Sequence, residues 1–308
     1  MREQRRIKIN TKERIVLSHN KIDYSGKKVV VTGGASGMGE SVVRLISELG
    51  AEVYVLDIKE GTLPVKQYIP VNLAKKDTID AAVAALPKGI DAVFHAAGIA
   101  GPIYSGARFS DLDIVTINYI GMRRCIEGII PKMNENSAIV LVSSIAAFFF
   151  RGRIADYTEF VNMDDWDASV KYISERMDDP KFAGGPVESN RTYSFAKECL
   201  CIYAMYRCWA LSEKKIRINT ICPGPTTTPM HGDFREITGN KRDSPMPSSP
   251  VGREAHPDEM AGAMLFLNSD VASYISGQDI CVDYGLAANW LYQGIEDHLK
   301  GRDHSKTV

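Results

Sequence analysis

The sequence predicts a single α/β domain built on a doubly wound, seven-stranded parallel sheet of the Rossmann type, with helices on both faces. From residue 27 onward, short β-branched runs alternate with longer helical patterns, an order typical of strand–helix–strand units. The runs are apolar almost throughout, as expected for parallel strands buried on both faces. A chain of 308 residues with 44% hydrophobic content can bury such a core.

Short β-branched and aromatic runs predict the first strands of the sheet. We expect these strands at 28–32, 52–57, 68–71 and 91–95. Between them, helical patterns predict one helix at 38–49, ended by Gly50, and another at 78–86, ended before Pro87.

The second half of the chain continues the same alternation. Strands are expected at 138–143, 216–222 and 279–283, and helices at 112–133, 192–214 and 257–268. Crossovers between parallel strands are right-handed, and such connections build a doubly wound sheet.

The domain at 27–287 is predicted to carry additional segments. They are a basic N-terminal extension at 1–26, a helical insertion at 148–188, a substrate flap at 230–250 and a C-terminal tail at 288–308. The insertion has a helical pattern near Trp166, Val170, Ile173 and Met177, and a connection this long inside a compact domain is usually functional. The Gly, Pro, Ser and charged residues of the flap suit a mobile loop.

The charge balance and the terminus argue against nucleic-acid and membrane partners. The formal net charge of −1 provides no global field for either. The N-terminus lacks the apolar stretch of a signal peptide. The longest apolar run, 138–150, is interrupted by Ser143 and Ser144 and is shorter than the roughly 20 residues of a spanning helix. We therefore expect a soluble, cytoplasmic protein.

The six cysteines predict neither a metal site nor a disulfide framework. They are Cys125, Cys199, Cys201, Cys208, Cys222 and Cys281. Their spacing has no paired C-x-x-C or Cys/His pattern of a zinc site. We expect reduced thiols that behave as small buried hydrophobes in a cytosolic protein.

A glycine-rich turn follows the first predicted strand. It has the sequence Thr32-Gly33-Gly34-Ala35-Ser36-Gly37-Met38-Gly39, and a helix follows it directly. Glycines in this place let the backbone approach a pyrophosphate, which the free N–H groups of the helix N-terminus stabilise. The alternative is an ordinary glycine-rich turn, but the position between strand and helix favours a dinucleotide site.

Asp57 ends the second predicted strand and indicates NAD rather than NADP. A carboxylate there can accept hydrogen bonds from both ribose hydroxyls, and it repels the additional phosphate of NADP. A solvated acid at a strand end is the alternative, and the nearby Lys59 could pair with a phosphate.

Tyr193 and Lys197 lie four residues apart on a predicted helix and therefore share one face. An ammonium beside a phenol favours the phenolate, so that the tyrosine can act as an acid or base closer to neutral pH. The same spacing occurs at Tyr24 and Lys28, where it leads into the first strand and is accidental.

Ser144 and Asn118 provide the context for this pair. Ser144 follows the fifth predicted strand, and ligands bind beyond the carboxyl ends of strands in a doubly wound sheet. The serine hydroxyl could hold a substrate oxygen there. Taken alone, Ser144 would more often be a capping residue and Asn118 a packing residue of its helix.

These residues together resemble the short-chain dehydrogenase/reductase family over roughly residues 26–286. The similar motifs are Thr32-Gly33-x-x-x-Gly37-x-Gly39, His95-Ala96-Ala97-Gly98, Pro223-Gly224 with Thr228, and Val282-Asp283-Tyr284-Gly285. Asn118, Ser144, Tyr193 and Lys197 match the family's catalytic tetrad in order. So many ordered motifs make the resemblance specific.

The resemblance implies the cofactor contacts as well as the catalytic residues. The expected NAD-binding residues are Gly33, Ser36, Gly37, Met38, Gly39, Asp57, Asn72, Leu73, Ala96, Ala97, Gly98, Tyr193, Lys197, Pro223, Gly224, Thr226 and Thr228. Two positions depart from the family pattern: His95 replaces an Asn, and Asn72 replaces an Asp beside the adenine.

The family mechanism implies a role for each member of the tetrad. Tyr193 would exchange a proton with the substrate oxygen, and Lys197 would lower the pKa of Tyr193 and bind the nicotinamide ribose. Ser144 would orient the oxygen, and Asn118 would hold a water of a proton relay reaching Lys197. Hydride passes between nicotinamide and substrate, so no metal is needed. A non-catalytic dinucleotide sensor is disfavoured because it would not need the phenol.

One subgroup is more similar than the rest. Pro250-Val251-Gly252-Arg253, the run around Glu259 and Ala272-Ser273-Tyr274 look like bacterial 3α-hydroxysteroid dehydrogenase/carbonyl reductases, which also carry a long insertion before the tyrosine. The resemblance implies a hydroxysteroid or bile acid as substrate. Coniferyl-alcohol dehydrogenases share the pattern, so an aryl or cyclic alcohol stays open.

The insertion and the flap are expected to form a hydrophobic substrate pocket. Phe148, Phe149, Phe150, Met230 and Phe234 would suit a bulky hydrophobic alcohol or ketone, although the phenylalanines could equally be core residues. Many relatives use the surface beside the tyrosine helix to assemble tetramers. Because the insertion precedes that helix, we expect a homodimer formed through the last helix and strand.

Overall fold

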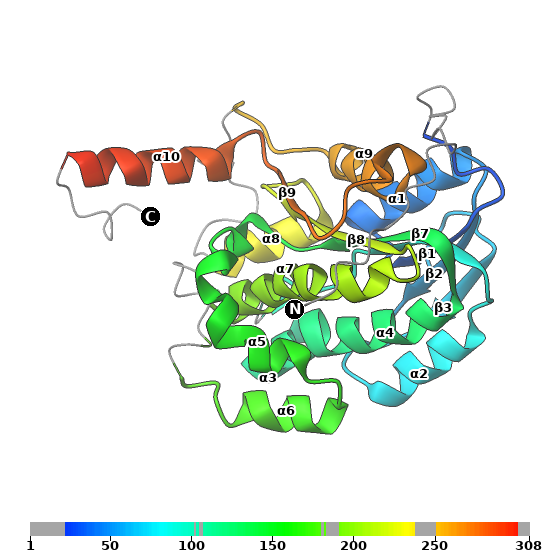
Figure 1. Ribbon diagram of the computed structural model, residues 1–308, viewed down its shortest axis with the longest axis horizontal. Coiled ribbons are helices and arrows are strands. Elements are labelled where there is room, and N and C mark those ends of the chain that lie inside the picture. Colours follow the sequence, from blue (N-terminus) through cyan, green and yellow to red (C-terminus); the bar gives the residue numbers. More distant parts are fainter. Residues whose placement is uncertain are drawn as a thin grey trace, which may run out of the picture.

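The computed structural model describes residues 22–101, 103–104, 107–179, 182, 191–237 and 251–300. Within these residues, one seven-stranded parallel sheet has the order β3-β2-β1-β4-β7-β8-β9 (Figure 1). The strands are β1 (Lys28–Thr32), β2 (Glu52–Asp57), β3 (Gln67–Pro70), β4 (Ile90–His95), β7 (Met133–Val142), β8 (Arg217–Pro223) and β9 (Asp279–Val282). The predicted doubly wound α/β fold is confirmed.

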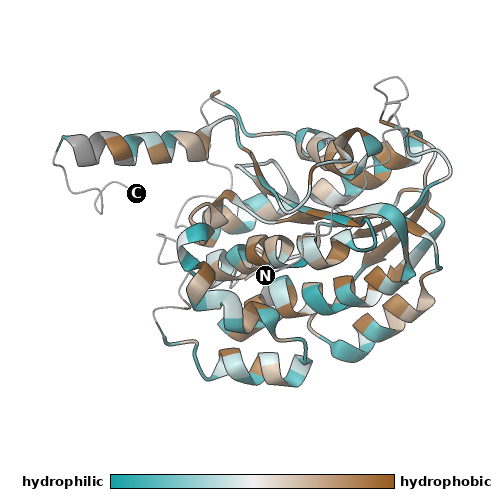
Figure 2. Ribbon diagram, in the orientation of Figure 1, coloured by the Kyte–Doolittle hydropathy of each residue, from teal (hydrophilic) through white to brown (hydrophobic). Residues whose placement is uncertain are grey.

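Helices cover both faces of the sheet (Figure 1). One face carries α1 (Gly37–Glu48) and α9 (Pro257–Asn268), and the other carries α2 (Lys76–Ala85), α4 (Met122–Ile129) and α7 (Arg191–Ser212). Because successive side chains of a strand point to opposite faces, the neighbours Val30 and Val31 enter different cores. Hydropathy colouring shows the strands as the apolar layer between the helices (Figure 2).

The helix predicted at 112–133 is interrupted in the structure. It consists of α3 (Asp111–Val115), a π-helical segment η1 (Thr116–Gly121), α4 and a 3-10 turn η2 (Ile130–Lys132), after which β7 begins at Met133. The predicted start of that strand at 138 was therefore wrong. A π-helical turn inside an α-helix is frequent at functional sites, and η1 contains Asn118.

The described part of the insertion, 148–179 and 182, is largely helical and packs on the tyrosine helix. A short turn η3 (Ile145–Ala147) precedes it, and it contains η4 (Phe150–Arg153), α5 (Ile154–Asn162) and α6 (Trp166–Ser174). Of these, only the region of α6 was predicted from the sequence. The Phe160 ring lies 5.2 Å from the Tyr119 ring and 5.6 Å from the Phe195 ring, so aromatic contacts join α5 to η1 and α7.

The remaining described elements are the short antiparallel pair β5 (Ile103–Tyr104) and β6 (Ala107–Arg108), α8 (Pro229–Ile237), the 3-10 turn η7 (Asp270–Ala272) and α10 (Leu286–Leu299). Helix α10 extends away from the body of the molecule (Figure 1), where only a C-terminal tail was predicted. Part of the predicted flap, 238–250, lies outside the described residues. No helix among the described residues is long and apolar enough to span a membrane.

Candidate active site

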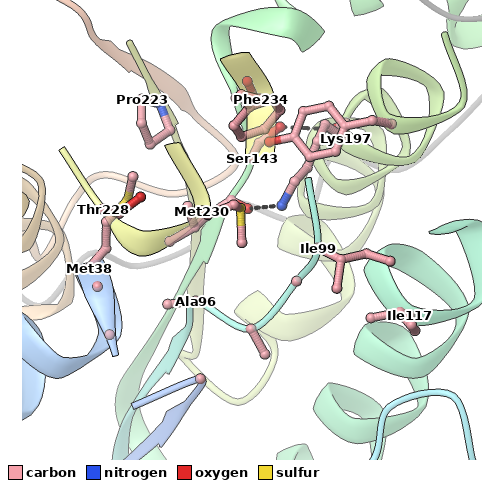
Figure 3. Close-up of a pocket in the computed structure, with 18 of the residues that line it drawn as sticks. Met38, Ala96, Ile99, Ile117, Ser143, Lys197, Pro223, Thr228, Met230 and Phe234 are labelled. Carbon is pink, nitrogen blue, oxygen red and sulfur yellow. Dashed lines mark hydrogen bonds between the residues drawn. The ribbon is translucent and has the colours of Figure 1, made fainter. Parts of the chain in front are cut away.

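A cavity of about 720 Å³ opens at the carboxyl ends of the strands, where ligands bind in doubly wound sheets. Every residue predicted to contact a dinucleotide lines this cavity. Of the predicted catalytic residues, Ser144, Tyr193 and Lys197 also line it. In the view of Figure 3, Met38 and Thr228 lie at one end of the cavity and Lys197 at the other.

The glycine-rich turn is shaped for close backbone approach. Gly33 has φ +72°, and a Cβ there would lie 2.6 Å from the Ala97 backbone nitrogen. A Cβ on Gly39 would lie 2.1 Å from the Gly33 carbonyl oxygen. Ser36 occupies the N-cap of α1 without a side-chain capping hydrogen bond. The first-turn N–H groups of α1 can therefore receive an anionic group, such as a pyrophosphate.

Asp57 lies at the cavity edge at the end of β2. Its two carboxylate oxygens accept hydrogen bonds from the backbone nitrogens of Ala35, at 3.0 Å, and Lys59, at 3.2 Å. These bonds fix the carboxylate, and each oxygen can accept a further hydrogen bond from a ribose hydroxyl. Asn72, which also lines the cavity, uses its side-chain oxygen to accept from the Ala74 backbone nitrogen at 2.9 Å.

His95, the departure noted in the sequence, lies behind the cavity rather than in it. Its Nδ1 is 2.7 Å from the hydroxyl of Thr32, so the side chain links the ends of β4 and β1. Burial lowers the pKa of His95 to about 3, and the positive charge of Lys197 acts in the same direction. The imidazole is therefore neutral and serves as a hydrogen-bonding residue of the sheet.

Lys197 is held from two sides at the end of β7. Its Nζ donates to the Val142 carbonyl oxygen at 2.8 Å, and its own carbonyl oxygen accepts from the Ser143 hydroxyl at 2.8 Å (Figure 3). The ammonium lies 5.5 Å from the centre of the Tyr193 ring. Burial lowers the pKa of Lys197 to about 8, so part of the lysine population loses its charge in mildly basic solution.

Tyr193 is buried, with 5% of its surface exposed. Burial raises the pKa of the phenol above its usual value, and a side-chain hydrogen bond with Ser144 acts in the opposite direction. That Lys197 lowers this pKa stays a prediction, since burial has the largest effect on the phenol and the hydrogen bond with Ser144 opposes it. The buried phenol is protonated near neutral pH and can donate a proton to a substrate oxygen.

Ser144 caps a turn and lines the cavity. Its hydroxyl caps η3 by accepting from the Ala146 backbone nitrogen at 3.1 Å, and the residue also lines the cavity beside Tyr193. The hydroxyl can still donate a hydrogen bond to a ligand oxygen.

Asn118 is fully buried and lies outside the cavity wall. Its side-chain oxygen accepts from the Ile99 nitrogen at 2.9 Å, and its side-chain nitrogen donates to the Ile99 oxygen at 3.0 Å. A Cβ on Gly98 would lie 2.8 Å from Asn118 Oδ1 and 3.5 Å from Lys197 Nζ. Because Gly98 has no side chain, the Asn118 side chain and the Lys197 ammonium can both lie close to it. Both polar atoms of the Asn118 side chain, however, bond to the backbone of Ile99.

The loop after β8 forms the wall opposite the glycine-rich turn. The Gly224 nitrogen donates to the Val282 oxygen at 3.0 Å, and a Cβ on Gly224 would lie 2.9 Å from Asp283 Cβ. The Thr226 hydroxyl donates to the Gly224 oxygen at 2.9 Å. This packing presents Pro223, Gly224 and Thr226 to the cavity as predicted.

The cavity has an apolar wall that the sequence predicted only in part. Its members are Ile99, Phe109, Ile117, Phe149, Met230, Phe234 and Trp290. Phe149, Met230 and Phe234 were expected there. By contrast, Phe150 is 2% exposed and belongs to the core, as the alternative interpretation held. Trp290 was missed because a single aromatic residue in a terminal helix carries no positional signal.

The second Tyr–Lys pair lies elsewhere. Tyr24 is completely buried and donates its hydroxyl hydrogen to the Leu265 oxygen at 2.8 Å, against α9. It does not line the cavity. Its interpretation as an accidental match is confirmed.

Comparison with known proteins matches two family models to this chain. The model described as short chain dehydrogenase matches residues 27–158, and the model described as enoyl-(acyl carrier protein) reductase matches residues 183–287. Together they cover both halves of the sheet and leave most of the insertion unmatched.

Individual relatives are similar over most of their length. The chain is 26% identical over 273 residues to a coniferyl-alcohol dehydrogenase of a Pseudomonas species, covering 88% of this chain and 100% of that protein. It is 27% identical over 272 residues to a 3-alpha-hydroxysteroid dehydrogenase/carbonyl reductase of Comamonas testosteroni, covering 84% and 96%. A crystal structure of 3-alpha-hydroxysteroid dehydrogenase from a Pseudomonas species, complexed with NADH, superposes with a TM-score of 0.67 at 22% identity, covering 85% and 98%.

Proposed function

The chain belongs to the short-chain dehydrogenase/reductase family and is an oxidoreductase acting on CH–OH groups; on this premise we propose that it interconverts a bulky hydrophobic secondary alcohol and its ketone, using NAD(H). The observation that carries the proposal is one cavity with a glycine-rich turn and α1 at one end and Tyr193, Lys197 and Ser144 at the other.

Asp57 supports NAD rather than NADP. Its carboxylate lines the cavity beyond the glycine-rich turn and is fixed by two backbone N–H groups. A fixed negative charge there accepts hydrogen bonds from ribose hydroxyls and repels an additional phosphate. Lys59 lines the same edge, but its backbone nitrogen helps to hold Asp57.

We assign the proton chemistry to Tyr193. During reduction its protonated phenol donates to the carbonyl oxygen of the substrate, and during oxidation it receives the alcohol proton. Ser144 orients that oxygen through its hydroxyl, and Lys197 places a positive charge beside the phenol. The nicotinamide, when bound, supplies or accepts the hydride. Asn118 acts as a positioning residue, because its side chain holds the Ile99 backbone beside Gly98.

The apolar wall supports a hydrophobic substrate of the hydroxysteroid or bile-acid class. Ile99, Phe149, Met230 and Phe234 can bury a flat polycyclic body against the cavity, and an alcohol near Tyr193 would lie at its polar end. Phe149 belongs to the insertion at 148–188. We propose that the insertion contributes to substrate selection in this way.

An aryl alcohol is the second candidate. The wall includes four aromatic side chains, Phe109, Phe149, Phe234 and Trp290. Such side chains favour offset or edge-to-face packing with an aromatic ring. The similarity to a coniferyl-alcohol dehydrogenase points in the same direction.

We further propose a homodimer. The insertion packs on η1 and α7 through Tyr119, Phe160 and Phe195, and the Tyr119 hydroxyl donates to the Val161 oxygen at 2.9 Å. That surface is therefore covered within the chain, which leaves α9 and β9 for assembly. Light scattering coupled to size exclusion tests this proposal, since a tetramer would contradict it.

A substrate panel tests the proposed reaction. Hydroxysteroids, bile acids, coniferyl alcohol and small cyclic alcohols are assayed by NADH absorbance, with NAD and NADP in parallel. We expect the highest kcat/KM with NAD and a hydroxysteroid. A preference for coniferyl alcohol would favour the second candidate, and no turnover of any alcohol or ketone would reject both.

A further inference from the structure

Three thiols meet beneath the loop after β8, outside the active-site cavity. Cys201 of α7 and Cys222 of β8 have their sulfur atoms 3.9 Å apart. Cys222 and Cys281 are register partners in the parallel strands β8 and β9. Neighbouring strands lie about 4.8 Å apart, a separation within the roughly 4.4–6.8 Å that a disulfide needs between its Cα atoms. No rearrangement of the sheet order is needed to join these two residues.

The three thiols differ in accessibility. Cys222 is 1% exposed and Cys201 is 2% exposed, whereas Cys281 is only partly buried on the edge strand β9. The Cys201 thiol also donates to the Ser143 hydroxyl oxygen at 3.3 Å. Cys281 packs on the α7 face of the sheet, whereas α9 packs on the opposite face, so a dimer formed through α9 and the outer edge of β9 leaves the Cys281 side chain on the other face. A small oxidant from solvent would therefore meet Cys281 first, with Cys222 behind it.

Hydrogen bonding between Cys222 and Cys281 shifts the pKa values of the two thiols in opposite directions. A hydrogen bond from Cys222 lowers the pKa of Cys281, and Arg151 acts in the same direction, against burial and the charges of Asp283 and Asp279. Hydrogen bonds with Cys201 and Cys281, together with burial, raise the pKa of Cys222. Thiolates are the nucleophiles in sulfur oxidation, so Cys281 is the more reactive of the two.

We propose that Cys281 and Cys222 form a peroxide-sensitive thiol pair that closes to a disulfide and lowers dinucleotide affinity. The Cys281 thiolate attacks one peroxide oxygen, the O–O bond breaks, and hydroxide leaves; the sulfur is oxidised to a sulfenic acid and the peroxide is reduced. The Cys222 sulfur then attacks the Cys281 sulfur and loses its proton, and the S–O bond breaks with release of water. Two thiols and one hydrogen peroxide thus give one disulfide and two waters.

The link to the cavity runs through the ends of both strands. Cys222 immediately precedes Pro223, and the Gly224 nitrogen is bonded to the Val282 oxygen at 3.0 Å. A disulfide holds its sulfur atoms about 2 Å apart with a fixed dihedral angle, so it ties β9 to the end of β8 and restricts the adjoining residues Pro223 and Gly224. Both of these residues line the cavity.

Peptide mass spectrometry and NADH fluorescence test the proposal on the full-length protein. The wild type is treated with hydrogen peroxide, and we expect a Cys222–Cys281 disulfide and an NADH Kd at least fivefold higher, both reversed by dithiothreitol. Cys281→Ser should keep its NADH affinity after the same treatment. Cys208→Ser is the matched control, because Cys208 is also partly buried but bonds to the Met205 carbonyl oxygen, and this variant should behave as the wild type.

Cys222→Ser isolates the first step. Without the second thiol, a sulfenic acid should persist on Cys281 and be trapped by dimedone. If this variant does not fold, Cys281→Ser still decides the outcome, because residue 281 lies at the sheet edge. The proposal would be overturned if the peroxide-treated wild type formed a Cys201–Cys222 disulfide or formed no Cys222–Cys281 disulfide. Equal labelling of Cys208 and Cys281 by dimedone would also overturn it. The thiol mapping does not depend on which alcohol the enzyme oxidises.

Discussion

Phe234 packs edge-on against Tyr193, with the ring centroids 5.1 Å apart and the ring planes inclined by 79°. Phe234 belongs to α8, whereas Tyr193 belongs to α7, so this contact joins the substrate wall to the proposed catalytic group. We therefore expect a substrate that approaches the phenol to pack against the Phe234 ring.

Replacing Phe234 with alanine is expected to raise the KM for a bulky hydrophobic alcohol about tenfold and to change kcat less. An edge-to-face pair contributes about 0.5–1.5 kcal/mol beyond the area it buries, and 1.4 kcal/mol corresponds to about tenfold. Steady-state kinetics measures the change. Phe266→Ala, on the partly exposed surface of α9, is the control and should leave KM unchanged. An unaltered KM in Phe234→Ala would show that the substrate does not depend on contact with this ring.

The reduction reaction is expected to slow as the pH rises through about 8. Lys197 has its pKa lowered to about 8 by burial, so its ammonium is present below that pH and lost above it. Reduction also needs the protonated phenol of Tyr193, which burial preserves. The kcat/KM for the ketone should therefore be level below pH 7 and fall above pH 8.

Lys197→Arg provides the comparison for this profile. A guanidinium stays charged to much higher pH, so the fall should move to higher pH in any variant that keeps measurable activity. A wild-type reduction rate that increases between pH 7 and 9 would contradict the assigned role of the lysine charge.

Much of the fold and of the cofactor site follows from local sequence signals. The apolar strand at 28–32 and the glycines after it determine both the first crossover and the close approach of Gly33 to Ala97. The Tyr193–Lys197 spacing places both side chains on one face, because residues four apart in a helix are neighbours. Such short-range patterns identify the cavity lining from sequence.

Long-range contacts explain what was missed. The π-helical turn at η1 holds Asn118 against the Ile99 backbone, a contact between residues 19 apart that helical periodicity does not encode. Trp290 lines the cavity from α10, a helix that the sequence did not predict. Burial also has the largest effect on the pKa of Tyr193, and burial depends on tertiary packing, which the spacing of Tyr193 and Lys197 does not encode.

Glu198→Gln is expected to stabilise the protein above pH 7. Glu198 is 1% exposed, and burial raises its pKa from 4.5 to about 7, while the neighbouring Tyr157 hydroxyl and the charge of Arg153 act in the opposite direction. Between pH 4.5 and 7 the folded chain keeps a proton that the unfolded chain has released, so the free energy of unfolding falls as the pH rises.

At a pH where the carboxyl is ionised in both the folded and the unfolded chain, this pKa shift lowers the free energy of unfolding by about 3 kcal/mol. In urea denaturation at pH 5 and pH 8, Glu198→Gln should have a higher free energy of unfolding than the wild type mainly at pH 8. Glu127→Gln is the contrasting variant, since Glu127 accepts hydrogen bonds from Tyr203 and Arg207, and it should lose stability at pH 8. An equal effect of Glu198→Gln at both pH values would contradict the buried ionisation.

Asp57→Asn is expected to reduce the preference for NAD over NADP by at least tenfold. The substitution removes the negative charge that repels the additional phosphate, while its amide oxygen can keep one backbone hydrogen bond at this position. Fluorescence titration of both reduced dinucleotides measures the ratio of Kd values. Asp91→Asn is the control and should leave this ratio unchanged, because Asp91 lies in β4 and accepts a hydrogen bond from the Lys28 nitrogen at the start of β1, away from the cavity. A wild type that binds NADPH as tightly as NADH would refute the role of Asp57.

Tyr193→Phe tests the central claim most directly, because it removes only the phenolic hydroxyl. Turnover of the best alcohol in the substrate panel and NADH affinity are measured on the same preparation. We predict that kcat falls by at least a thousandfold while the NADH Kd stays within a few-fold of the wild type, since acid–base catalysis contributes about 10²–10⁴-fold and the phenol also orients the substrate oxygen. A variant that retains near-normal kcat would show that another group carries the proton.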